Sequence, residues 1–240
     1  MSTSPSDPLR IASYNIRKAV GTDRRRDPAR ILRVIAETGA EVVLLQEADL
    51  RLPPRRPVLD SAAIRAATGL EPVGLDHGRI SLGWHGNAVL AAPGIEVTGV
   101  RLHDLPGLEP RGCISVEMMR NGKAFRVVGV HLGLLRSSRR LQLTAVLGFL
   151  QDGDAMPTLI AGDFNERSLA VGLGRLARQF RILSGGPSYH SRWPVFALDR
   201  MAVTAEFRPL RMKVHRSAEA DRASDHLPLV GEFLLAPQGG

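Results

Sequence analysis

The sequence predicts an α+β fold in which two packed β-sheets are flanked by helices, and three observations support this prediction. Apolar strand-like segments end in polar residues at Asn15, Glu47, His131 and Asp163. The first two of these residues are separated by 32 positions, and so are the last two. A helical pattern lies inside each interval, which indicates two similar strand–helix–strand halves. Because each sheet must bury one face, we expect the two halves to pack together with their polar strand ends in one cleft.

The first half begins with an alternating strand at residues 9–16, which follows a loose polar tail at residues 1–8. A helix is expected to start at Asp27-Pro28, since proline suits the first helical position, and to end before Gly39. Residues 41–47 are mostly apolar and predict a buried strand that ends at the carboxylate of Glu47.

The second half repeats this plan. Residues 125–132 predict an apolar strand, residues 137–151 show helical spacing, and residues 157–162 predict another apolar strand that runs into Asp163. The halves also agree beyond this point. Asn87 follows Glu47 by 40 residues, and Asp199 follows Asp163 by 36. Arg111 then follows Asn87 by 24 residues, and Asp225 follows Asp199 by 26. No Gly/Ser-rich linker divides the halves, so residues 9–235 are expected to form a single domain.

The composition is that of a soluble globular protein of 240 residues, 44% of them hydrophobic and 23% charged. No apolar run approaches the ~20 residues that a transmembrane helix needs. Residues 1–8 lack the pattern of a secretory signal, and the single cysteine, Cys113, excludes an internal disulfide. We therefore expect a cytoplasmic protein, a monomer without an obligate protein partner.

The net charge of +8 favours an anionic partner. The codon usage of a GC-rich genome would explain why arginine replaces lysine, but it does not explain the excess of bases over acids. Runs of arginine follow three of the polar strand ends, so they are expected to rim the cleft; the alternative is a solvated basic face. These residues are Arg24–Arg26, Arg51, Arg55, Arg56, Arg136, Arg139 and Arg140.

The segment Gly162-Asp163-Phe164-Asn165 carries the strongest chemical signal. A strand that ends in Asp163 and Asn165 places a carboxylate and an amide on the same side of the backbone. One can act as a base while the other grips a phosphate oxygen. The alternative is an Asx turn at a strand end, which aspartate and asparagine often form.

A second segment, Ser224-Asp225-His226, precedes an apolar strand. His226 can donate a hydrogen bond to a phosphate oxygen, and Asp199 is available to fix its tautomer. Glu47, at the end of a buried strand, is suited to Mg²⁺, which needs only one or two protein carboxylates. An ordinary loop and a solvated carboxylate are the respective alternatives.

Taken together and in order, these segments resemble the endonuclease/exonuclease/phosphatase superfamily, which includes DNase I, sphingomyelinases and deadenylases. The resemblance runs from residue 10 to about residue 234. It implies a four-layer αββα sandwich with the site at one edge of the paired sheets. It also implies a phosphodiesterase with Mg²⁺, or Mn²⁺, as cofactor, in which Asn15 and Glu47 bind the metal and Asp225 lies near a possible second metal position.

The resemblance further implies the roles of the remaining residues. Asp163 matches the residue that orients and deprotonates the attacking water, and Asn165 matches the amide that holds the scissile phosphate. His226 matches a phosphate-contacting histidine that Asp199 orients. His131 matches a histidine near the leaving group.

Arg111 and Asn87 match positions that line the cleft, and Arg136 and Arg140 are further substrate-binding candidates. One departure concerns His131. DNase I has a glutamate partner for the matching histidine shortly before the segment 86–90, where this chain has no carboxylate. Contact with a phosphate oxygen is therefore the expected role of His131.

The expected activity is metal-dependent phosphodiester hydrolysis, foremost by a nuclease, because the arginine runs extend beyond a single head group. The alternative is a phosphodiesterase or phosphatase for phospholipid head groups or small molecules. A non-catalytic binding protein is a remote third reading, since such a protein should have lost Asp163, Asn165 or His226, and all three are present.

Overall fold

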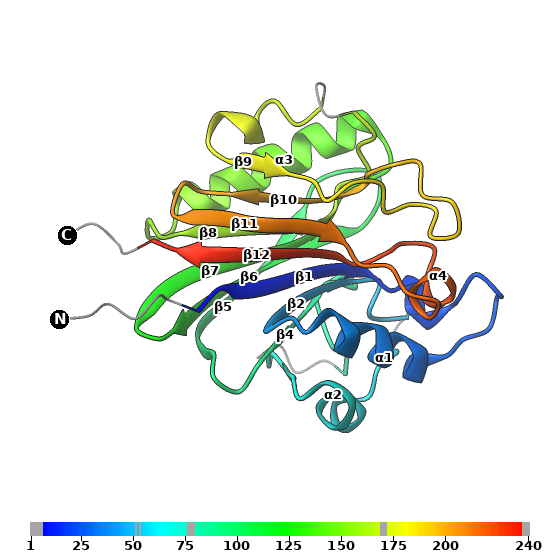
Figure 1. The fold of residues 1–240 in the computed structure, drawn as a ribbon. Helices are drawn as coiled ribbons and strands as arrows, with labels where there is room; N and C mark the ends of the chain where they lie inside the picture. The colour runs from blue at the N-terminus through cyan, green and yellow to red at the C-terminus, as the bar shows by residue number, and fades with distance from the viewer. Residues whose placement is uncertain (1–6, 51, 53, 76–79, 169–171, 237–240) are drawn as a thin grey trace.

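The computed structural model contains two six-stranded sheets that pack face to face, with helices on their outer sides (Figure 1). It describes residues 7–50, 52, 54–75, 80–168 and 172–236. Most of the tail expected at residues 1–8 therefore lies outside the described residues, and the first strand begins at Leu9. The predicted sandwich of two packed sheets flanked by helices is confirmed.

The strands of the first sheet are β1 (Leu9–Asn15), β2 (Val42–Gln46), β3 (Glu71–Pro72), β4 (Ala88–Ala91), β11 (Phe207–Val214) and β12 (Leu229–Leu235). Those of the second sheet are β5 (Glu96–Leu105), β6 (Arg111–Arg120), β7 (Lys123–His131), β8 (Thr158–Asp163), β9 (Arg181–Leu183) and β10 (Asp199–Val203). The α-helices are α1 (Pro28–Thr38), α2 (Ser61–Thr68), α3 (Arg136–Gln151) and α4 (Ala220–Ala223). Two short 3₁₀ turns are η1 (Arg17–Ala19) and η2 (Leu176–Arg178).

The two sheets have equivalent topologies, which accounts for the repeated spacings in the sequence. Their strand orders are β11-β12-β1-β2-β4-β3 and β5-β6-β7-β8-β10-β9. β1 and β2 are parallel and joined through α1, just as β7 and β8 are parallel and joined through α3. The neighbours β4 and β10 each run antiparallel to the second strand of their pair. The sequence repeat therefore reflects two copies of one strand arrangement.

The helix ends follow the local signals in the sequence. The side chain of Asp27 accepts a hydrogen bond from the Arg30 amide at the start of α1. Gly39 ends this helix with a left-handed φ of 59°. Both ends of α1 thus lie where the sequence predicts them.

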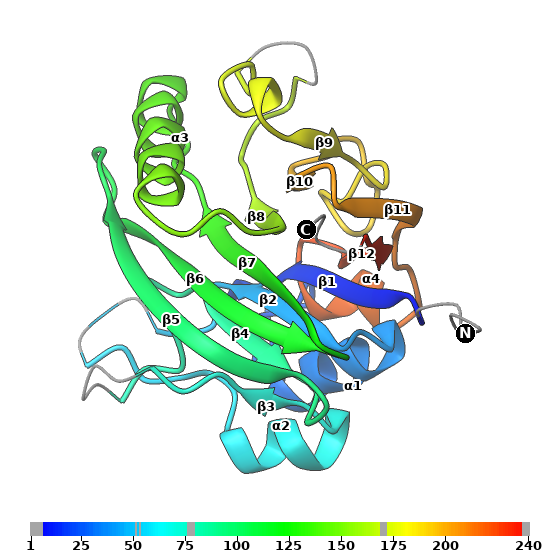
Figure 2. The same cartoon turned by 90° about the vertical axis from the view of Figure 1, so that its left-hand side faces the viewer.

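Three apolar layers stabilise the sandwich. The central layer lies between the sheets and includes Ile11, Leu44, Val127 and Leu159. A second layer packs one sheet against α1 and α2, and a third packs the other sheet against α3. Figure 2 shows α3 on one side of the sheets and α1 and α2 on the other. No helix of the described residues is long and apolar enough to span a membrane.

The fold brings many strand ends to one edge of the sandwich, which we call the site edge. The parallel strands β1, β2, β7 and β8 end there, while β4, β6, β10 and β12 begin there. The start of β1 and the end of β12 lie at the opposite end (Figure 1). Gly162, one residue before the end of β8, has a φ of 156°, and a Cβ there would lie 1.8 Å from the Val130 carbonyl oxygen. Glycine at this position therefore allows the β7–β8 pairing that brings Asp163 beside His131.

Candidate active site

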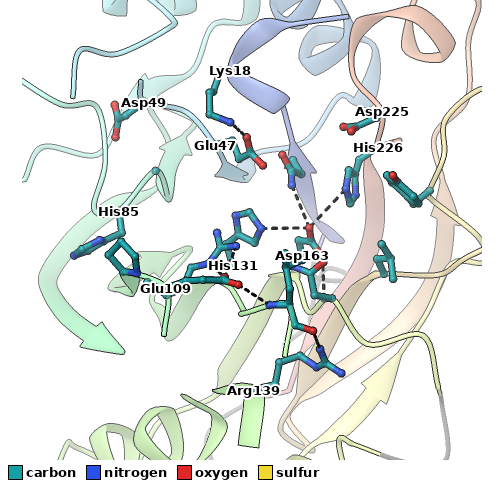
Figure 3. A pocket seen from close by; sticks show the side chains of 18 of the residues that line it. Lys18, Glu47, Asp49, His85, Glu109, His131, Arg139, Asp163, Asp225 and His226 are labelled. Carbon is teal, nitrogen blue, oxygen red and sulfur yellow. Dashed lines mark hydrogen bonds and ion pairs between the residues drawn. The ribbon is translucent and has the colours of Figure 1, made fainter. Parts of the chain in front are cut away.

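An open cavity of about 710 Å³ lies at the site edge and receives side chains from both sheets (Figure 3). Ten of the residues singled out in the sequence line it. They are Asn15, Glu47, Arg55, Arg111, His131, Arg139, Asp163, Asn165, Asp225 and His226. Segments far apart in the chain thus converge on one polar cavity of a size that suits a small ligand.

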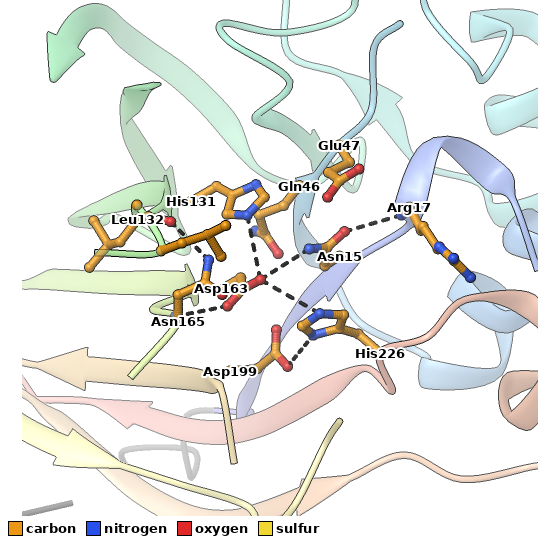
Figure 4. A network of polar contacts seen from close by, with 12 residues as sticks. Asn15, Arg17, Gln46, Glu47, His131, Leu132, Asp163, Asn165, Asp199 and His226 are labelled. Atoms are coloured by element: carbon orange, nitrogen blue, oxygen red, sulfur yellow. Dashed lines mark hydrogen bonds and ion pairs between the residues drawn. The ribbon is translucent and has the colours of Figure 1, made fainter. Parts of the chain in front are cut away.

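Asp163, at the end of β8, lies at the centre of the polar network in Figure 4 and is almost fully buried. Its Oδ2 accepts a hydrogen bond of 3.1 Å from the Asn15 amide, and its Oδ1 accepts one of 2.9 Å from the Asn165 backbone. Burial raises its pKa to about 6, the Asp199 charge also raises it, and the charge of His226 and the two hydrogen bonds oppose this rise. The carboxyl group is therefore mostly ionised at neutral pH.

Two histidines flank this carboxylate. The Nε2 atoms of His131 and His226 lie 3.5 Å and 3.6 Å from Asp163 Oδ2. Burial lowers the pKa of His131 well below its ordinary value, and the positive charges of Arg111 and His226 lower it further. His131 is therefore neutral at neutral pH.

His226 is held in the opposite protonation state. Burial lowers its pKa, but the charges of Asp199 and Asp163 outweigh burial and raise it to about 10. Its Nδ1 lies 2.9 Å from Asp199 Oδ2, which also accepts a hydrogen bond from Ser188. Asp199 is completely buried behind the imidazole, so the ring keeps Nδ1 toward Asp199 and Nε2 toward Asp163. The site thus holds a cationic and a neutral histidine on one carboxylate.

Glu47, just beyond β2, forms an ion pair with Lys18 of η1. Both residues line the cavity, and both have left-handed backbone conformations with φ near 54°. Non-glycine residues rarely adopt such φ values, and they concentrate at functional sites. Asn165 also has a positive φ of 49°, and its amide donates to the Leu132 carbonyl at 2.9 Å.

Hydrogen bonds join the end of β1 to the Ser-Asp-His segment. The Ser224 hydroxyl donates to the Asn15 carbonyl oxygen at 2.7 Å. Arg17 binds both parts, since its backbone donates to Asn15 Oδ1 and its side chain lies 3.4 Å from Asp225 Oδ2. Ser224 therefore positions the segment that carries Asp225 and His226.

The wall across from His226 contains several charged groups, of which His85, Glu109 and Glu166 were not singled out in the sequence. Arg111 pairs with Glu109 at 3.0 Å. His85 Nε2 lies 2.9 Å from Asp104. Arg139, from the buried side of α3, pairs with Glu166 at 2.9 Å. Arg139 stood within a predicted arginine run and Glu166 followed the Asp163 segment, so proximity to these motifs was the only signal.

Four of the other candidates lie outside the cavity wall. Asp199 is behind His226, and Asn87 is buried with its amide donating to the Gly112 carbonyl at 2.9 Å. Arg136 and Arg140 are exposed on α3. Arg51 lies outside the described residues.

Among the described residues, no three His, Cys, Asp or Glu side chains are grouped so that they could hold a metal ion by themselves. The oxygen donors that the sequence indicates are two carboxylates and an amide: Glu47, Asp225 and Asn15. All three line the cavity. This set suits a hard cation that retains several water ligands, as Mg²⁺ does. Cys113 lies away from the site, and burial raises its thiol pKa to about 12.

Fold and site define a two-sheet sandwich in which an acidic residue, an amide and two histidines meet at a sheet edge. The model of the Endonuclease/Exonuclease/phosphatase family matches residues 12–226, and the chain belongs to this family. Family members are hydrolases that act on phosphate esters. The match includes every candidate site residue named above.

One curated relative is the uncharacterized protein YbhP of Escherichia coli strain K12, which is 34% identical over 170 residues. This match spans 64% of the present chain and 64% of YbhP, so the chain covers less than two thirds of that relative.

Solved structures with the same fold include the human Nocturnin catalytic domain, with a TM-score of 0.73, 17% identity and coverage of 95% of each chain. Another is the mannosyl-6-phosphatase Bt3783 of Bacteroides thetaiotaomicron, with a TM-score of 0.73 and 16% identity over 95% of this chain and 100% of that chain.

Proposed function

We propose that this protein hydrolyses a phosphodiester by attack of a water molecule that Asp163 activates. The observation that supports this most is the position of the Asp163 carboxylate, which is almost fully buried and flanked by two histidines in an open cavity. A phosphodiester repels nucleophiles, so both a base and positive charge are needed at such a site. Family membership supports the same reaction class.

In the proposed reaction, the water oxygen forms a bond to phosphorus while the bond between phosphorus and the leaving oxygen breaks. Asp163 accepts one proton of the water, and the leaving oxygen takes up a proton to become an alcohol. The products are a phosphate monoester and this alcohol. A positioned base of this kind contributes roughly 10²–10⁴-fold to the rate.

The groups around Asp163 would stabilise the charge that develops on the phosphate. The protonated His226 offers Nε2–H to a phosphate oxygen, and the Asp199 contact keeps it oriented and charged. Asn165 and the neutral His131 can donate further hydrogen bonds. In this assignment His131 contacts a phosphate oxygen and does not act as a charged proton donor.

The proposed cofactor is Mg²⁺, with Mn²⁺ as a substitute, held by Glu47 and Asn15 with Asp225 beside them. Family enzymes generally use divalent metal ions. The donor set fits, because it consists of oxygen atoms and opens into the cavity that contains Asp163. A bound Mg²⁺ supplies neutralisation of the phosphate charge and stabilisation of the leaving oxygen.

A substrate assay tests this function. Hydrolysis of bis-p-nitrophenyl phosphate, plasmid DNA, RNA and phospholipid vesicles would be measured with Mg²⁺, with Mn²⁺ and with EDTA. We expect hydrolysis of at least one diester, loss of the activity in EDTA and recovery on addition of Mg²⁺. The arginine runs favour nucleic acid, whereas the exposed apolar residues on the loops around the cavity favour a lipid head group. Full activity in EDTA would refute the metal, and inertness toward every diester would refute the reaction.

Lys18 leads to a separate prediction about metal affinity. Its ammonium group lies on the Glu47 carboxylate, so an incoming cation must displace it or tolerate its charge. Lys18→Met should therefore tighten Mg²⁺ binding by about tenfold, as expected for removal of a like charge a few ångströms away. The measurement is the Mg²⁺ concentration that gives half of the maximal thermal shift.

Lys213→Met is the matched control, because Lys213 is exposed on β11, away from the cavity. Its Mg²⁺ midpoint should equal that of the unmodified protein. An unchanged or weakened midpoint in Lys18→Met would show that Lys18 does not compete with the metal for Glu47.

A further inference from the structure

Exposed apolar side chains are concentrated at the site edge. Among the described residues, ten large hydrophobic side chains are exposed. Seven of them lie on segments that leave or enter strands at the edge where the cavity opens: Leu52, Ile80, Leu108, Leu134, Leu135, Trp193 and Val195. The other three, Val97, Leu141 and Leu210, lie on β5, α3 and β11. We refer to the seven as the apolar rim.

The topology explains why these loops surround the cavity. Leu52 follows β2 and Ile80 precedes β4, whose ends lie beside Glu47. Leu108 joins β5 to β6 immediately before Arg111, which lines the cavity. Leu134 follows β7 and itself lines the cavity, and Trp193 lies in the loop that leads into β10. Every loop of the apolar rim is therefore adjacent to a strand end that carries a site residue.

The most exposed members of the apolar rim contribute little to packing within the protein. Leu108 and Trp193 are 82% and 81% exposed, so their side chains contribute little to any core. Single exposed hydrophobic residues are normal on a protein surface. Their concentration around one cavity is not, and such grouping usually marks a surface that contacts an apolar partner.

Positive charge accompanies the apolar rim. Arg24, Arg25 and Arg26 are exposed in the loop between β1 and α1, Arg56 is exposed after β2, and Arg192 is exposed next to Trp193. A mixture of exposed leucine or tryptophan with arginine matches a lipid surface, where apolar side chains enter the acyl boundary and guanidinium groups meet phosphates. Basic residues near an anionic bilayer strengthen such binding through the negative surface potential of the lipid.

We propose that the apolar rim docks the site edge onto an anionic phospholipid surface, from which the cavity takes a head-group phosphodiester as substrate. The docking rests on the rim itself, whereas the hydrolysis of the head group rests on the proposed function. A single-stranded nucleic acid fits less well, because bases stack on aromatic rings and Trp193 is the only aromatic member of the apolar rim.

The test measures vesicle binding of the full chain by co-sedimentation. Vesicles of phosphatidylcholine mixed with phosphatidylglycerol are compared with vesicles of phosphatidylcholine alone. The double variant Leu108→Ser/Trp193→Ser removes two rim side chains that do not line the cavity. The matched control, Leu141→Ser/Leu210→Ser, removes two equally apolar exposed side chains elsewhere on the surface.

The unmodified protein should bind the anionic vesicles more tightly than the neutral ones. The rim variant should lose at least about tenfold in binding, since burial of Leu and Trp in the interface is lost, while the control variant retains it. Tryptophan emission should shift to shorter wavelength on vesicles, and this shift should be largely absent in Trp193→Phe.

Absence of vesicle binding, or equal losses in the rim and control variants, would overturn the docking. If the rim variant instead loses binding to a single-stranded oligonucleotide, the apolar rim is a nucleic-acid surface and the proposal is wrong. Hydrolysis of bis-p-nitrophenyl phosphate should be the same in all variants. Vesicle binding without hydrolysis of any diester would refute the proposed function while leaving the docking intact.

Discussion

Asp163→Asn is expected to lower kcat for diester hydrolysis by at least about 10²-fold, because the amide cannot accept a proton from water. The substitution preserves the shape of the side chain, and its Oδ1 can still accept the hydrogen bond from the Asn165 backbone. It also removes a carboxylate from a buried position, so no loss of folding is expected. Steady-state kinetics with bis-p-nitrophenyl phosphate, together with far-UV circular dichroism, would measure both effects.

Asp154→Asn is the matched control, because Asp154 is exposed and lies in the loop between α3 and β8. It should retain normal turnover. Near-normal kcat in Asp163→Asn would mean that another residue activates the water, and the assignment of the base would then have to move.

His226→Ala is expected to produce the second large effect, again a loss of at least about 10²-fold in kcat. It removes the cationic donor from beside Asp163. Asp199→Asn should lower kcat by a smaller factor, because an asparagine oxygen can still accept a hydrogen bond from His226 Nδ1. This variant loses only the charge that keeps His226 protonated. The order of the two losses is the informative quantity.

Both variants should be compared at equal fractions folded, as judged by thermal unfolding, because His226 and Asp199 are buried. A greater loss in Asp199→Asn than in His226→Ala would mean that Asp199 has a direct part in the reaction. Unchanged kcat in His226→Ala would remove this histidine from the phosphate-binding set.

The sequence predicts the two-sheet sandwich well because its strongest signals are local. Parallel strands joined through a helix place Asn15 beside Gln46 in one sheet and His131 beside Asp163 in the other. The paired residues are 31 apart in the first sheet and 32 apart in the second, which accounts for the matching 32-residue spacings of Asn15 to Glu47 and of His131 to Asp163. The cap residues Asp27 and Gly39 act within one helical turn, so their effect is also visible without tertiary information.

Residues placed by tertiary contacts were harder to predict. Lys18 lies in a short 3₁₀ turn with left-handed backbone angles, which has no periodic signal, yet it reaches Glu47. In the arginine run of α3, the helix rotation buries Arg139 against Glu166 and leaves Arg136 and Arg140 exposed. The weak amphipathic pattern of this helix, whose buried side includes Ser138 and Gln142, hides that difference from sequence reasoning.

The residues around Asp163 come from both sheets, so the rate of turnover depends on how the two sheets pack against each other. Asn15 and His226 belong to the β1 and β12 side, whereas Asp163 and Asp199 belong to β8 and β10. A hydrogen bond weakens when its atoms are displaced by more than a few tenths of an ångström. A small shift of one sheet relative to the other would therefore abolish the proposed activity before either sheet unfolds. A partly unfolded form could retain most of its circular dichroism and have no activity. Two separately produced half-chains, each inert, would regain activity only by reassembling the whole sandwich.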